Sequence, residues 1–169
     1  MANIDVEFRA PVPSETPQLL ALARASGLFT DNELGDLLGA TLAELHAGKL
    51  SAGHAVRVAT LPTGEVLGWL YQAPTEAPDE QELLWIGVDP QRHRSGAGTA
   101  LLLEAERLAR GAGCSWLRVS TSSLPATAPA RALYERRGFT RTEVVPDFYG
   151  PGDDAVVYRK QLEGGVGTS

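Results

Sequence analysis

The stretch that decides the fold reads Val88-Asp89-Pro90-Gln91-Arg92-His93-Arg94-Ser95-Gly96-Ala97-Gly98-Thr99-Ala100-Leu101. It begins at the end of a short apolar segment, 82–88, which is typical of a buried strand. It then passes through a polar, basic turn into residues 96–112, where apolar side chains recur at helical spacing. Backbone amides at the start of a helix point outward without partners, and the helix dipole adds positive potential there. The stretch therefore predicts an anion-binding turn suited to a phosphate or pyrophosphate.

Two common phosphate-binding motifs do not fit this turn. A nucleotide-binding P-loop requires a lysine after its last glycine, and none follows Gly98. A dinucleotide-binding turn requires a third glycine, which is also missing. At this point the residues leave open a different nucleotide site, or an ordinary glycine-containing turn without a ligand.

Strand and helix patterns alternate on both sides of the turn. Strand-like segments are expected at 4–9, 54–61, 65–73, 82–88, 115–121, 139–145 and 155–161. Helices are expected after an N-cap at Ser14, after a capping box formed by Thr30 and Glu33, at 96–112, and at 127–137. This order predicts one α/β (α+β) domain, residues 1–163, in which about four helices flank a central mixed, mostly antiparallel sheet of about seven strands. Residues 164–169 are expected to form a flexible tail.

Composition narrows the class of protein. The chain has 169 residues, with 15 basic and 21 acidic side chains and a formal charge of −6, which argues against a nucleic-acid partner. A single cysteine, Cys114, excludes a disulfide framework and a multi-cysteine zinc site. Neither a secretory signal nor an apolar stretch of about 20 residues is present, which argues against a membrane partner. We therefore expect a cytoplasmic protein with no metal.

Two spaced motifs resemble those of the GNAT acetyltransferase superfamily. The turn and the helix start resemble the family's acetyl-CoA pyrophosphate loop, Gln/Arg-x-x-Gly-x-Gly/Ala, with His93 in the leading position. Residues Ala130–Phe139 resemble its Leu-Tyr-Glu-x-x-Gly-Phe helix. The resemblance covers nearly the whole chain. It implies a GNAT-type domain, acetyl-CoA as the co-substrate, and transfer of an acetyl group directly to an amine.

The resemblance also implies which residues contact the cofactor. They are Ile86, Val88, His93, Arg94, Ser95, Gly96, Ala97, Gly98, Thr99, Thr127 and Arg131. The family usually has asparagine at the position of Thr127, so a polar contact to the pantetheine arm is expected to be altered.

Two residues are candidates for proton transfer. A phenol with an ordinary pKa of about 10 can return a proton to a leaving thiolate, and the resemblance gives that role to Tyr134. The alternative is that Tyr134 only packs beside Phe139. Glu82 is the candidate base that deprotonates the amine, as in histone-type members of the family. The alternatives are that Glu82 is a solvated edge residue and that ordered water carries the proton.

The acceptor side is predicted from the segment Asp147–Asp154, which combines aromatic and acidic residues that suit an ammonium group. Its alternative is an ordinary polar turn. The candidate substrate residues are Phe29, Asp147, Tyr149 and Asp153.

The expected acceptor is a small-molecule primary amine, and the alternative is a protein or peptide N-terminus. A non-catalytic acyl-CoA-binding regulatory module is a second alternative. Dimers are common in the family, so a homodimer is compatible with the resemblance.

The net charge conceals an uneven distribution. Residues 90–142 contain nine arginines and three acidic residues, a formal charge of +6, so the remainder carries −12. This division suits an anionic cofactor at one site and a cationic amine at another, through electrostatic steering.

Overall fold

The computed structural model describes residues 5–26, 31–92 and 95–162. Its chain forms two compact units, which are treated separately below. The first comprises Met1–Gln72 and Trp85–Glu104, and the second comprises Ala73–Leu84 and Ala105–Ser169. The hydrogen-bonded strand order is β1-β2-β3-β4-β5-β7-β6. The expected seven-stranded mixed sheet is therefore confirmed. No helix in the described ranges is long and apolar enough to span a bilayer.

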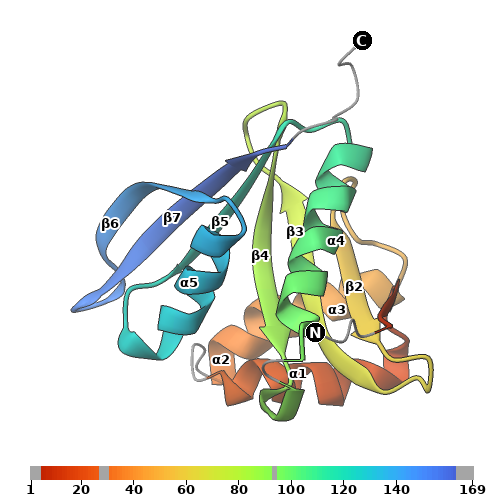
Figure 1. Ribbon diagram of the computed structural model, residues 1–169. Coiled ribbons are helices and arrows are strands. Elements are labelled where there is room, and N and C mark those ends of the chain that lie inside the picture. Colours follow the sequence, from red (N-terminus) through yellow and green to blue (C-terminus); the bar gives the residue numbers. More distant parts are fainter. Residues whose placement is uncertain (1–4, 27–30, 93–94, 163–169) are drawn as a thin grey trace. The chain divides into compact units, whose positions relative to one another are not determined.

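The first unit contains antiparallel strands and most of the helices (Figure 1). Its complete strands are β1 (Glu7–Arg9) and β2 (Ala55–Thr60), joined by most of β3 (Val66–Pro74) and the end of β4 (Glu80–Val88). Its helical elements are η1 (Pro13–Glu15), α1 (Thr16–Ala25), α2 (Asp31–Glu33), η2 (Leu34–Gly39), α3 (Ala40–His46), η3 (Pro90–Arg92) and the start of α4 (Ala97–Gly111). The segment η2 is a π-helix, which divides the predicted second helix into three parts.

The core of the first unit forms where helices cover the sheet. Trp69 is fully buried, and its indole N–H donates to the carbonyl of Leu19 on α1 at 3.0 Å. Its ring centroid lies 6.0 Å from that of Trp85 on β4. Leucines at helical spacing, including Leu38 and Leu42, complete this core. One helix face and one sheet face are therefore buried together.

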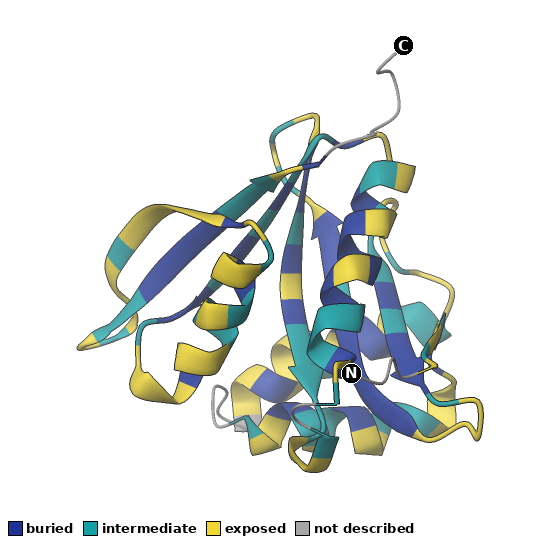
Figure 2. Ribbon diagram, viewed as in Figure 1, coloured by how far each residue is buried: buried dark blue, intermediate teal, exposed yellow. Residues whose placement is uncertain are grey.

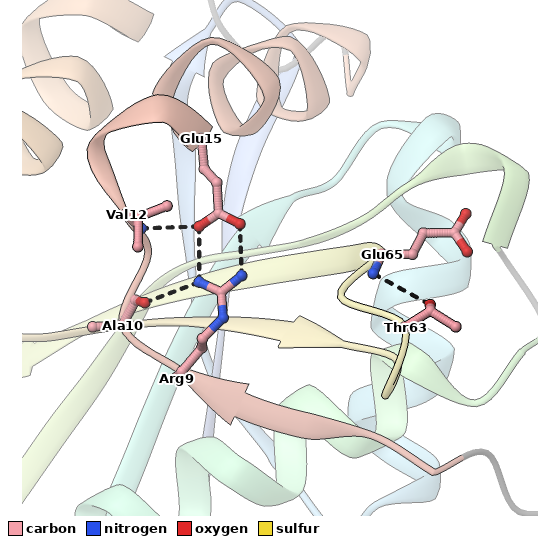
Figure 3. A network of polar contacts seen from close by, with 6 residues as sticks. All are labelled: Arg9, Ala10, Val12, Glu15, Thr63 and Glu65. Carbon is pink, nitrogen blue, oxygen red and sulfur yellow. Dashed lines mark hydrogen bonds and ion pairs between the residues drawn. The ribbon is translucent and has the colours of Figure 1, made fainter.

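The predicted N-cap at Ser14 is wrong. Ser14 lies inside η1, and α1 begins after Glu15 without a side-chain cap. The carboxylate of Glu15 accepts hydrogen bonds from the guanidinium of Arg9 at 2.9 and 2.7 Å and from the amide of Val12 at 2.9 Å (Figure 3). These charge-assisted bonds lower the pKa of Glu15 and are stronger than a hydroxyl cap. The predicted cap at Thr30 lies outside the described residues.

The second unit is built around strands that follow the basic turn in sequence. It contains the start of β4, together with β5 (Trp116–Ser122), β6 (Thr140–Gly150) and β7 (Asp153–Gln161). Its helical elements are the rest of α4, η4 (Pro125–Thr127) and α5 (Ala128–Arg136). β4 and β5 pair in parallel from Glu80↔Trp116 to Leu83↔Val119. β7 pairs antiparallel with both β5 and β6 and is buried along its centre, whereas β6 is exposed (Figure 2).

Candidate active site

The predicted anion-binding turn begins where β4 ends, in the first unit. The amide of Asp89 donates to the carbonyl of Leu67 on β3 at 2.8 Å, which fixes the exit of the chain from the sheet. The Asp89 carboxylate accepts from the amide of Gln91 at 3.0 Å, and the amide of Arg92 donates to the Asp89 carbonyl at 2.7 Å. The side chain of Arg92 pairs with Glu65 on the loop before β3. Asp89 and Glu65 therefore give this turn a defined start.

Helix α4 begins immediately after a glycine whose backbone conformation few other residues adopt. Gly96 has φ +89°, and no atom lies within 4 Å of where its Cβ would be. The amide of Ala97 donates a hydrogen bond to the hydroxyl oxygen of Ser95 at 3.3 Å. Thr99 is half-buried in the first turn of the helix. The first turn of a 15-residue helix thus follows an open glycine corner, which suits close approach by an anion.

Close contact between β3 and β4 fixes the position of this helix start. A Cβ at Gly68 would lie 2.3 Å from the carbonyl oxygen of Gly87 and 3.1 Å from a methyl group of Leu101 on α4. Leu101 is fully buried, so α4 packs directly over the two strands. The absence of a side chain at Gly68 allows this approach.

One face of β4 is less buried than the other. Gln81, Leu83 and Trp85 are buried, whereas the residues that alternate with them are half-buried or exposed. This open face carries Glu82, Leu84, Ile86 and Val88. Leu84 is 48% exposed, although it is apolar and central in the strand. The predicted contacts Ile86 and Val88 therefore point to the face that a ligand can reach.

Tyr134 lies on α5 in the second unit and is almost completely buried. Its ring centroid is 5.9 Å from that of Phe139 and 5.6 Å from that of Tyr158, so the predicted packing beside Phe139 is confirmed. Burial raises the pKa of the Tyr134 phenol well above its ordinary value, and Tyr149 and Tyr158 raise it further. The phenol therefore keeps its proton at neutral pH and is available to donate it.

Thr127 and Arg131 hold the connection between β5 and α5. The Thr127 hydroxyl lies 2.7 Å from the carbonyl of Ser122 and accepts from the guanidinium of Arg131 at 2.5 Å. The same guanidinium nitrogen donates to the Ser122 carbonyl at 2.6 Å and to the Leu124 carbonyl at 3.1 Å. Both residues were predicted to contact the cofactor. The Thr127 hydroxyl and one guanidinium nitrogen of Arg131 form these bonds within the protein, and the cofactor contact stays a prediction.

The predicted loop Asp147–Asp154 comprises the end of β6, a turn and the start of β7, and it is called the β6–β7 loop below. Its acidic residues also bond within the protein. The Asp153 carboxylate accepts from the hydroxyl of Ser122 at 2.5 Å. The Asp147 carboxylate accepts from the amide of Gly152 at 2.8 Å, and Asp147 itself has φ +54°. These bonds fix the conformation of the loop, and its aromatic side chains point outward. Phe148 is 63% and Tyr149 48% exposed, with ring centroids 5.0 Å apart in an edge-to-face arrangement.

Several predicted residues interact electrostatically within the second unit. Burial raises the pKa of Glu82, Arg118 lowers it and Glu80 raises it. Burial also raises the pKa of Tyr149, and so do the negative charges of Glu82 and Asp153. Within the second unit, Tyr149 thus lies in electrostatic range of both Glu82 and Tyr134. Ile86, Val88 and Ser95–Thr99 belong to the first unit, and Phe29, His93 and Arg94 lie outside the described residues.

Sequence reasoning did not single out Arg118 or Ser122. Arg118 is the register partner of Glu82, and Ser122 ties the β6–β7 loop to β5. A charged residue in the run 116–119, whose other residues are apolar, was the available signal for Arg118. Nothing in the sequence separates Ser122 from the other serines near it.

Comparisons with known proteins agree with this fold. The model of the acetyltransferase (GNAT) family matches residues 14–139. A protein from Desulfovibrio desulfuricans that is assigned to the GNAT family has a structure similar to this one, with a TM-score of 0.84 and 31% identity over 94% of this chain and 99% of that one. The chain therefore belongs to the GNAT acetyltransferase family.

Two curated relatives differ in their acceptors. The Escherichia coli [ribosomal protein bS18]-alanine N-acetyltransferase is 39% identical over 84 residues, 47% of this chain and 54% of that protein. The aminoglycoside N(6')-acetyltransferase type 1 of Klebsiella aerogenes is 31% identical over 116 residues, 65% of this chain and 75% of that protein. The first match thus spans about half of the relative's length.

Proposed function

We propose that the chain is an N-acetyltransferase that transfers an acetyl group from acetyl-CoA directly to the primary amine of a small molecule. The observation that carries this proposal is the turn from Val88 to Thr99, which leads from an open strand face into the first turn of a long helix within a GNAT-family chain. The turn would bind the pyrophosphate through backbone amides, and Ile86 and Val88 would contact the pantetheine arm. A cytoplasmic location stays a prediction.

The side chains of the second unit would move the protons. Glu82 accepts a proton from the ammonium group of the acceptor, which makes its nitrogen nucleophilic. Tyr134 donates its proton to the thiolate sulfur as the new carbon–nitrogen bond forms and the carbon–sulfur bond breaks. The second proton that the nitrogen loses restores the Tyr134 phenol through solvent, and Glu82 releases the first to solvent. The products are the N-acetylated amine and the CoA thiol. A raised pKa suits Glu82, because a base works best near the operating pH, and the raised pKa of Tyr134 keeps its phenol protonated until the thiolate forms.

Direct transfer is supported by the environment of the only cysteine. Cys114 is buried, and burial raises the pKa of its thiol, with Asp79 and Glu80 raising it further. A thiol in this environment is a poor nucleophile. In the proposed reaction the acetyl group therefore passes to the amine without an acetyl-cysteine intermediate at this position.

A thiol-release assay with acetyl-CoA tests the proposed reaction. Small primary amines, polyamines, amino acids, aminoglycosides and peptides form the acceptor panel. We expect turnover with at least one small amine, and mass spectrometry of that product should show one added acetyl group. Binding of acetyl-CoA without turnover of any amine would instead indicate an acyl-CoA-binding module.

Acetylation of a protein N-terminus is the second candidate function. It is favoured by the similarity to the ribosomal-protein-alanine N-acetyltransferase and by the exposed Phe148–Tyr149 pair, which offers ring surface to a peptide. Turnover confined to peptides in the same panel would select this function over the first.

The pH dependence of kcat tests the role of Glu82. Because burial raises the pKa of Glu82, its protonation should inactivate the enzyme at a pH above the ordinary glutamate range of about 4.3. Activity should fall as pH decreases through that pKa. Glu82→Gln should lower kcat by about 100-fold or more and abolish this acid limb. Glu143→Gln removes an exposed carboxylate of the same unit and should leave the limb unchanged. If Glu82→Gln retains the wild-type acid limb, another group or water is the base.

A further inference from the structure

The second unit contains a cavity of about 660 Å³. Its lining combines a turn after β3 with charged side chains from β4 and β5. The lining residues are Pro74, Thr75, Glu76, Ala77, Glu80, Glu82 and Arg118. Some charged side chains of this cavity have hydrogen-bond partners in the protein and others do not. This difference indicates what the cavity would bind.

Glu80 is fully engaged by the protein. Its carboxylate accepts from Nε of Arg159 at 2.6 Å and from the hydroxyl of Thr75 at 2.9 Å. The guanidinium of Arg159 also lies 4.1 Å from the ring centroid of Trp116. The carboxylate of Glu80 therefore already has a cation and a hydroxyl as partners within the protein.

Arg118 has no such hydrogen-bonded partner among the described residues, although Glu82 opposite it is close enough for the two charges to interact. In the sheet it lies between Glu82 on β4 and Arg159 on β7. It is half-buried, its Nε is buried without a hydrogen-bond partner, and it forms no ion pair within 4.0 Å in the described part of the chain. A buried guanidinium nitrogen without a hydrogen-bond acceptor is costly. An anion that accepts a hydrogen bond from Arg118 would relieve this penalty.

We propose that Arg118 binds a carboxylate of the acceptor, so that the substrate is an amine of the amino-acid class, with the ammonium group directed to Glu82. A guanidinium can bind a carboxylate in a planar, bidentate arrangement, which a point charge cannot reproduce. Glu82 and Arg118 lie opposite each other on neighbouring strands and form no ion pair within 4.0 Å in the described part of the chain. Their charges match a molecule that carries ammonium and carboxylate groups a short distance apart. This inference rests on the proposed function and specifies its substrate.

Matched acceptors test the proposal. Amino acids are compared with their C-terminal amides and with the corresponding decarboxylated amines, using kcat/KM from the thiol-release assay. We expect the free acids to be preferred by about 10-fold or more, the range that a charge-assisted contact supplies. Arg118→Met should remove this preference by lowering kcat/KM for the acids much more than for the amides. Arg118→Lys should restore only part of it.

Controls separate binding from folding and from electrostatic effects on Glu82. Arg141→Met removes an exposed arginine of the same unit and should leave the preference unchanged. Wild type and Arg118→Met are also titrated calorimetrically with N-acetyl amino acids, a measurement that does not require turnover. Amides accepted as well as acids, or equal losses for both with Arg118→Met, would overturn the carboxylate assignment while leaving acetyl transfer intact. Titrations that give the same affinity for both proteins would overturn it even if no amine is acetylated.

Discussion

Tyr134→Phe is expected to lower kcat by about 100-fold or more, the usual contribution of a general acid. The ring stays in its packed position between Phe139 and Tyr158, so only the proton donor is lost. The hydroxyl makes no hydrogen bond with the residues that the structure describes, and stability should therefore change by less than about 1 kcal/mol. Steady-state kinetics, acetyl-CoA titration and thermal unfolding measure the three effects.

Tyr158→Phe is the matched control for this substitution. It also removes one phenolic hydroxyl from the same aromatic cluster, but that hydroxyl donates to the Glu135 carboxylate at 2.8 Å. Its loss should lower the free energy of unfolding by about 1 kcal/mol and affect kcat much less than Tyr134→Phe does. If the two variants lose activity equally, the cluster acts through packing and Tyr134 is not the acid.

Gly68→Ala is expected to cause the largest loss of stability among the substitutions considered. The added methyl group would collide with the Gly87 carbonyl, a backbone atom that cannot rotate away, and would crowd Leu101 on α4. Overpacking of this kind costs about 3 kcal/mol, equivalent to a decrease in Tm of roughly 6–12 °C for a chain of this size. Because the collision separates β3 from β4 and α4, acetyl-CoA affinity should fall as well.

Gly35→Ala controls for the general effect of replacing a glycine. Gly35 is exposed in η2, and no atom lies within 4 Å of its missing Cβ. Alanine there should leave stability unchanged or raise it by about 0.5–1 kcal/mol. Thermal unfolding and calorimetric titration with acetyl-CoA should therefore separate the two variants. A Gly68→Ala protein with wild-type Tm would show that β3 and β4 can move apart without cost.

The elements that could be predicted from sequence are those specified by local chemistry. The β4–turn–α4 segment combines an apolar strand, a glycine corner and a helical apolar face, so each part agrees with the next. The helix that carries Tyr134 ends before Gly138 for a similar local reason, because Gly138 has φ +91°. The π-helical segment η2 could not be predicted, since its sequence has ordinary helical spacing and tertiary packing selects the wider turn.

Side-chain roles were harder to predict than elements. Asp147 and Asp153 have the composition of an ammonium-binding loop, yet their carboxylates accept hydrogen bonds from the protein itself. Short polar side chains in turns readily bond to nearby backbone, and sequence does not show which partner is in reach. Arg118 was missed for the opposite reason. Its Nε is buried without a hydrogen-bond partner, and its register partner is Glu82. Neither fact can be read from the sequence.

The bonds made by Ser122 have a consequence for protein engineering. Its hydroxyl holds the β6–β7 loop through Asp153, and its carbonyl accepts from both Thr127 and Arg131 at the start of α5. The loop that carries Tyr149 and the helix that carries Tyr134 are thus anchored to one residue. A chimera that imports a relative's loop to change acceptor choice should import the serine–aspartate anchor with it. Transplanting the loop alone would disturb the helix that carries Tyr134.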